Sequence, residues 1–273
     1  MKGQRSMLSM LTLIRGSGDA ASILRSVTVF QKSIDAELLV AHPDPVASTQ
    51  AVMSSPDGYA VPIDMDEMEL TAKAARSAFD VVCGTSADCR FKVMASSARD
   101  TLLKQSLFAD ICVLPREHGL IGDDFRLLKA ALVDGGTPTV LLPPEPVTTP
   151  LTTVVFSWNG QAAAARAIRA AMPFAMQAKR LVVLEHAGNE VNRSRLENFL
   201  HRHDVRPAEW RPYGDKDLAA RGRARALLAA ARSEDCDLMV MGAYGDIGDS
   251  FFRFGRATEK VANAARIPVL FSH

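Results

Sequence analysis

Three spaced glycines after an apolar run, near the end of the chain, form the pattern with the clearest chemistry. The run at 237–241 leads directly into Gly242 and Gly245, and nine residues separate Gly245 from Gly255. Glycine lets a backbone approach a ligand closely because it has no Cβ atom. A helix that begins after Gly255 would present unpaired N–H groups to an anion such as phosphate. The pattern therefore predicts a nucleotide-binding site in the C-terminal part of the chain.

The composition is that of a globular protein with a substantial core. Of the 273 residues, 48% are hydrophobic and 23% are charged, and the net charge is +1. A nearly neutral chain gives no reason to expect nucleic acid or an anionic membrane as a partner. The apolar run at 7–14 is interrupted by polar residues and is too short to span a membrane, so a cytoplasmic location is expected. The four cysteines show no metal-ligand spacing, although Cys83 and Cys89 are close enough in sequence for a redox pair.

The chain contains two copies of one unit. Residues 13–42 align without a gap with residues 157–186, and His42 then meets His186. Further on, residues 110–114 align with residues 237–241. The boundary falls in the segment 143–150, whose four prolines favour a stiff, extended linker. Self-similarity of this kind indicates a tandem duplication.

Each unit alternates apolar strands with amphipathic helices, which predicts an α/β fold with a parallel sheet covered on both faces. In the first unit, 1–143, strands are expected at 7–14, 37–42, 90–95, 110–114 and 139–142, and helices at 20–33, 66–82, 99–108 and 125–134. In the second unit, 151–273, strands are expected at 151–157, 180–186, 209–212, 237–241 and 268–272, and helices at 162–177, 193–201, 218–232 and 257–265. Ligands of such sheets bind beyond the carboxyl ends of the strands, where Asn159, His186 and Gly242 are expected.

With these features the chain resembles the universal stress protein family in its tandem two-domain form. The resemblance rests on the spacing of Gly242, Gly245 and Gly255, on the ending at 267–270 and on the Trp158-Asn159-Gly160 turn. It implies an open five-stranded parallel sheet of the adenine nucleotide α-hydrolase-like type in each unit. It also implies that the units pair through their last strands as a pseudo-dimer within the chain, which leaves room for a further homodimer.

The resemblance implies a site for the phosphates and ribose of ATP at the three glycines, with Met241 and Ala257 beside them. In nucleotide-binding members the last glycine is followed by Ser or Thr, whose hydroxyl reaches a phosphate. Arg256 stands there in this chain, either as a charged fork on phosphate or as a surface arginine. Thr258 either supplies a hydroxyl two positions later or is structural. A side chain at Gly242 is expected to fill the phosphate cradle and abolish binding.

Asn159 stands where the family places an acidic residue that contacts adenine or ribose. An asparagine can still donate and accept hydrogen bonds, so it predicts weaker recognition of the base. The alternative is a turn residue, because Asn-Gly favours tight turns. His186 at the next strand end is expected to line the same cleft, although a lone histidine at such a place is more often structural.

The glycine pattern is lost from the first unit. Pro115 and Phe125 align with Gly242 and Gly255, and Arg15 aligns with Asn159. Proline has no N–H to donate, and a phenylalanine ring is bulky where a phosphate needs bare backbone. At most one ligand site per chain is therefore expected.

Two functions follow from these features. The first is a stress-response module that binds ATP or AMP weakly in the second unit, with Mg²⁺ accompanying the nucleotide. The second is a tandem stress protein that binds no nucleotide and acts through protein partners. No Gly-x-Ser-x-Gly elbow and no metal-ligand cluster occur in the sequence, so catalysis beyond slow ATP hydrolysis is not expected.

Overall fold

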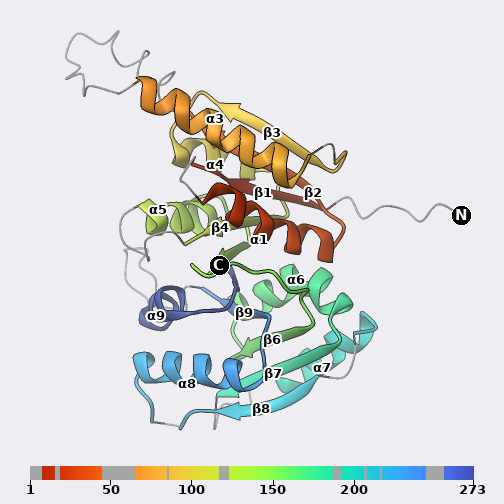
Figure 1. The fold of residues 1–273 in the computed structure, drawn as a ribbon. Coiled ribbons are helices and arrows are strands. Elements are labelled where there is room, and N and C mark those ends of the chain that lie inside the picture. The colour runs from red at the N-terminus through yellow and green to blue at the C-terminus, as the bar shows by residue number, and fades with distance from the viewer. Residues whose placement is uncertain are drawn as a thin grey trace, which may run out of the picture.

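One continuous ten-stranded sheet forms the centre of the molecule (Figure 1). The computed structural model describes residues 8–15, 19–44, 65–84, 86–116, 123–186, 192–205, 208–215, 217–243 and 255–273, with side chains undescribed at 65–68 and 256. The first half contributes β1 (Ser9–Leu13), β2 (Glu37–Pro43), β3 (Cys89–Met94), β4 (Ile111–Pro115) and β5 (Thr139–Leu142). The second half contributes β6 (Thr153–Trp158), β7 (Arg180–His186), β8 (Glu209–Tyr213), β9 (Leu238–Gly242) and β10 (Val269–Ser272).

The order of the strands repeats in the two halves and is β3-β2-β1-β4-β5-β10-β9-β6-β7-β8. Within each half all neighbouring strands are parallel, and β5 and β10 pair antiparallel at the centre. The predicted fold, two five-stranded parallel units joined through their last strands, is confirmed. Edge strands β3 and β8 carry exposed or half-buried residues throughout, whereas the central β5, β6 and β10 are wholly buried. Polar edge strands discourage pairing with other chains.

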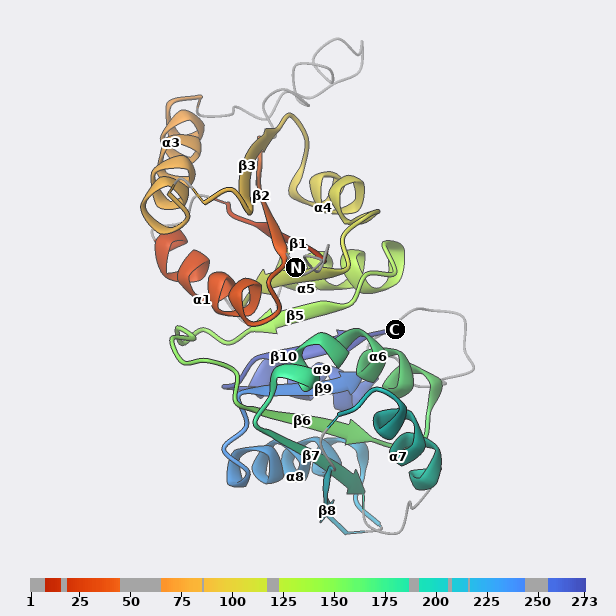
Figure 2. The same ribbon diagram turned by 90° about the vertical axis from the view of Figure 1, so that its right-hand side faces the viewer.

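Helices cover both faces of the sheet (Figure 2). One face carries α1 (Ala20–Ser33), α3 (Met65–Val82), α6 (Ala162–Gln177) and α7 (Arg193–Arg202), and the other carries α4 (Ala98–Ser106), α5 (Asp123–Lys129), α8 (Ala220–Ser233) and α9 (Arg256–Ala264). The expected helix at 125–134 is divided. Its second part is the π-helical segment η1 (Ala130–Asp134), in which the Gly135 N–H donates to the Ala130 carbonyl at 2.8 Å.

The junction of the two halves is buried on both faces of the sheet. On one face, the rings of Phe30 in α1 and Phe174 in α6 meet edge to face with their centroids 5.9 Å apart. Both rings are fully buried. On the other face, Leu128 and Leu132 join the same apolar cluster as α9. The two halves therefore share continuous cores instead of touching across a surface.

Arg116 links the halves by hydrogen bonds. It follows β4 in the first half and is 5% exposed. Its Nη1 and Nη2 atoms donate to the carbonyls of Ala262 and Ala265, each at 2.5 Å. Carbonyls at the C-terminal end of a helix have no intrahelical partner and carry partial negative charge. Burial lowers the pKa of Arg116, and the charges of Glu145 and Asp124 oppose that shift. The first half thus holds the last turn of α9.

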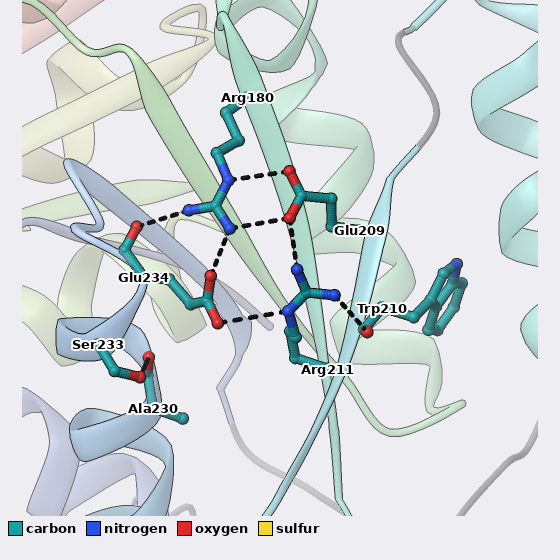
Figure 3. A network of polar contacts seen from close by, with 7 residues as sticks. All are labelled: Arg180, Glu209, Trp210, Arg211, Ala230, Ser233 and Glu234. Carbon is teal, nitrogen blue, oxygen red and sulfur yellow. Dashed lines mark hydrogen bonds and ion pairs between the residues drawn. The ribbon is translucent and has the colours of Figure 1, made fainter.

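A network of charged side chains ties the amino ends of β7 and β8 together (Figure 3). The Arg180 guanidinium donates two hydrogen bonds of 2.9 Å to the Glu209 carboxylate. It donates another, of 2.5 Å, to the carboxylate of Glu234, the residue that follows α8. Arg211 pairs with Glu209 at 2.7 Å. The network lies at the amino ends of the strands, whereas the candidate site is expected at their carboxyl ends. We therefore assign it a structural role.

Replacing Arg116 tests the link between the halves. We expect Arg116→Gln to lower the free energy of unfolding by about 2–4 kcal/mol, because two charged hydrogen bonds are lost and buried carbonyls are left unpaired. Urea denaturation followed by circular dichroism measures the change. The matched control is Arg266→Gln, since Arg266 is highly exposed and lies 4.0 Å from Glu145. Equal stability of the native protein and Arg116→Gln would show that the link contributes nothing.

The charged network predicts a pH dependence of stability. Its hydrogen bonds from Arg180 hold the pKa of Glu209 below its ordinary value of 4.5. A lowered carboxyl pKa contributes stability above the unfolded pKa, and that contribution is lost as pH falls through the folded pKa. The difference in unfolding free energy between the native protein and Glu209→Gln should therefore be constant near neutral pH and shrink below about pH 4.5. A difference that does not change between neutral pH and pH 3 would contradict this account.

Candidate functional site

The carboxyl edge of the second half brings together three of the predicted site residues. Strands β9, β6 and β7 are neighbours in the sheet, and Gly242 and His186 are the last residues of β9 and β7. Asn159 directly follows β6. Gly255 lies at the N-terminus of α9, which returns to β10 and so begins at the same edge. Gly245 and the rest of the loop 244–254 lie outside the described residues.

Gly242 is required by the packing of α6. A Cβ atom at this position would lie 2.5 Å from the backbone nitrogen of Ala164 and 2.7 Å from the carbonyl carbon of Ala163. Contacts this short with backbone atoms cannot be relieved by a side-chain movement. The close approach that excludes a side chain here is that of α6. The expected role of Gly242 in a phosphate cradle stays a prediction.

Gly255 has no close neighbour in the part of the chain that the structure describes. Of the residues that the structure describes, a Cβ atom here would meet only the Thr258 hydroxyl, at 4.0 Å. The residue caps α9 with φ −54° and ψ 142°, a conformation open to other residues, and no side chain caps the helix. The N–H groups of the first turn, residues 256–258, have no partner among the described residues, and N–H groups at this end of a helix can bind an anion.

Thr258 lies inside that first turn and is 4% exposed. Its hydroxyl faces Gly255, and Ala257 beside it is half-buried. Met241, the residue before Gly242, is buried in the core shared by β9 and α9. Met241 and Ala257 thus shape the site through packing, whereas Thr258 places a polar group at it. The side chain of Arg256 lies outside the described part of the chain.

Asn159 forms a turn. Its Oδ1 atom accepts a hydrogen bond of 3.0 Å from the Gln161 N–H, and Gly160 has a φ of +74°. This is the local bonding that makes asparagine common in turns. This hydrogen bond supports the turn interpretation of Asn159.

His186 carries a buried polar atom that lacks a partner among the described residues. Its Nε2 atom is buried and has no hydrogen-bond partner among the described residues. The matching His42, by contrast, binds the Ile14 carbonyl through Nδ1 at 2.7 Å. Buried polar atoms are almost always paired, so an unpaired ring nitrogen at a strand end points to a missing partner such as water or a ligand.

Tyr213 and Ser157 surround this histidine and were not predicted from the sequence. The rings of His186 and Tyr213 meet edge to face with centroids 5.5 Å apart. Burial raises the pKa of Tyr213, and a hydrogen bond with Ser157 and the charge of Arg223 oppose the shift. Tyr213 is the last residue of β8 and Ser157 the last but one of β6, so both lie near the carboxyl ends of strands adjoining β7, and that position was the available signal. Together the three side chains form a small polar cluster on the α8 face of the sheet.

The equivalent edge of the first half is closed by an internal ion pair. Arg15, at the position of Asn159, binds Asp124 in the first turn of α5 at 2.6 Å. The Asp124 side chain is only 4% exposed. A buried carboxylate near a helix N-terminus occupies the electrostatic position that an anionic ligand would take. His118, the counterpart of Gly245, lies outside the described residues.

Two further searches covered the described residues. Within them, no group of three or more His, Cys, Asp or Glu side chains is placed to hold a metal ion. No helix in the same ranges is both long and apolar enough to cross a membrane. Cys83 and Cys89 are in contact and unbridged, and burial raises the pKa of Cys83 to about 12.

The different roles of the two glycines can be tested by stability. Gly242→Ala should cost about 1–3 kcal/mol, because α6 must move to admit the methyl group. Gly255→Ala should cost under about 1 kcal/mol, the loss of a modestly favoured cap residue. Thermal unfolding of the two variants provides the comparison, and each serves as the control for the other. Equal costs would contradict the assignment of Gly242 to helix packing.

Comparisons with known proteins agree with this architecture. A model of the universal stress protein family matches residues 218–273. No curated protein sequence matches the chain significantly. Among solved structures, a universal stress protein from Archaeoglobus fulgidus DSM 4304 matches with a TM-score of 0.66 at 14% identity, covering 97% of both chains.

Other structures share the fold at similar length. A putative universal stress protein from Pseudomonas aeruginosa UCBPP-PA14 has a TM-score of 0.63 at 12% identity, covering 98% of this chain and 94% of that one. The cytoplasmic domain of a prokaryotic cation chloride cotransporter has a TM-score of 0.55 at 7% identity, covering 97% and 95%. The resemblance to the universal stress protein family in its tandem form is thereby confirmed, by sequence over 218–273 and by fold over almost the whole chain.

Proposed function

We propose that the second half binds an adenine nucleotide, ATP or AMP, as part of a stress-response module of the cytoplasm. The observation that carries the proposal is the N-terminus of α9, where, among the described residues, only Thr258 comes near Gly255 and no side chain caps the helix. The first half has Asp124 at its equivalent helix. One nucleotide per chain is therefore proposed.

In this proposal the phosphates lie against the first turn of α9. The N–H groups of residues 256–258 donate to phosphate oxygens, and the helix dipole favours the negative charge. The Thr258 hydroxyl, which faces Gly255, adds a donor. Arg256 is assigned to the phosphates from its place in the sequence, and Mg²⁺ would be held by the phosphate oxygens of ATP.

The base is assigned to the carboxyl ends of β6 and β7. His186 offers its Nε2 atom, which has no hydrogen-bond partner in the described part of the chain and can donate to or accept from the edge of a purine. Asn159 takes a secondary part because its Oδ1 atom is engaged in the turn. These limited polar contacts support weak binding.

The turn that Asn159 forms favours a second function, in which no nucleotide is bound. Because Asn159 already satisfies a backbone N–H, the residue is explained without any ligand. In that case the protein binds no nucleotide and acts through protein partners. The two functions are separated by one binding experiment.

Calorimetric titration with ATP, Mg-ATP and AMP tests the proposal. We expect dissociation constants between about 10 μM and 1 mM, and at least a tenfold loss of affinity in Gly255→Val and Thr258→Val, because the side chains remove space and a donor at the phosphates. Thr71→Val, on α3 in the first half, is the matched control. Absence of heat and of any thermal shift at millimolar nucleotide would leave the protein-partner function.

A further inference from the structure

A cleft of about 580 Å³ separates α6 from α7, away from the first turn of α9. In the first half the corresponding helices, α1 and α3, pack closely against each other. The side of α6 that faces the cleft carries the short side chains of Ala162 and Ala165. The two halves can therefore be compared directly. The space between the two corresponding helices is closed in the first half and open in the second.

The floor of the cleft is apolar and partly aromatic. Trp158, Ile168, Leu196 and Phe199 line it. Trp158 and Leu196 belong to the main core, so this floor is fixed by packing. A rigid apolar floor suits a flat hydrophobic group, which is how ligand pockets usually bind the body of a small molecule.

Three arginines surround this floor. Arg169 comes from α6, and Arg195 and Arg202 come from the same side of α7, seven residues apart. Within the described ranges, Arg195 and Arg202 form no side-chain hydrogen bond or ion pair, and Arg169 uses only its Nε atom, toward the Ala165 carbonyl at 3.3 Å. Most of their guanidinium donors therefore remain available at the cleft.

The arginine at the other side of α7 shows the contrast. Arg193 binds Glu197 at 3.1 Å and lies over the Trp210 ring, 4.3 Å from its centroid. It is therefore satisfied by the protein itself. The carboxylate of α7 is thus paired with Arg193 and leaves the charge of Arg195 and Arg202 uncompensated within that helix.

We propose that this cleft is a second ligand site, for a small organic anion with a flat apolar body and a carboxylate or phosphate group. Guanidinium groups bind both kinds of oxyanion through paired N–H donors, and they also stack on aromatic rings. The apolar floor binds the body, and the arginines bind the acidic group. The site is separate from the first turn of α9 and does not depend on nucleotide binding there.

Calorimetry with four probes tests the proposal. Naphthyl phosphate and naphthoate carry both the ring and the acidic group, naphthalenemethanol lacks the charge, and inorganic phosphate lacks the ring. We expect both ringed anions to bind with sub-millimolar dissociation constants, and the other two probes to bind at least about tenfold more weakly. The tighter of the two ringed anions identifies the preferred acidic group.

Variants locate the site. Arg195→Gln and Arg202→Gln should each weaken naphthyl phosphate binding about tenfold, and Ala165→Phe should abolish it by filling the cleft. Arg221→Gln, on the exposed side of α8, is the matched control. Saturating ATP should leave the affinity unchanged. Equal binding of the neutral alcohol, unchanged affinity in the cleft variants, or displacement by ATP would each overturn the proposal.

Discussion

The antiparallel pairing of β5 with β10 is the constraint on which the rest of the molecule depends. Every other neighbouring pair of strands is parallel, so the carboxyl edges of the two halves point in opposite directions. A ligand at a carboxyl edge can therefore contact only one half directly. Arg116 crosses this junction from the end of β4 to the last turn of α9, and so links the first half to the far end of the helix that begins at Gly255.

The two halves have the same strand order but differ in how the polar groups at their carboxyl edges are paired. In the first half, polar groups at the carboxyl edge satisfy one another, through Arg15 with Asp124 and His42 with the Ile14 carbonyl. In the second half, within the described residues, His186 has a ring nitrogen without a hydrogen-bond partner and no side chain caps the first turn of α9.

Much of the fold could be predicted because apolar periodicity and the internal repeat are local features. The helices 20–33 and 162–177 and the strand 180–186 have the predicted bounds. The π-helical segment η1 was missed, since a wider turn leaves no distinct pattern. The contact of Gly242 with α6 was also missed. A glycine in a sequence indicates that some group approaches the backbone closely, but it does not indicate which one. Tyr213 and Ser157 became visible only when the strand order placed them beside His186.

The central claim is that nucleotide binds at the first turn of α9 in the second half alone. Its most direct test is the change in backbone amide chemical shifts, measured by NMR, on addition of ATP. The account predicts the largest changes at residues 255–258, with smaller ones at Asn159 and His186. It predicts none at Arg15 or Asp124. Changes centred on the first half, or none at residues 255–258 at saturating ATP, would contradict it.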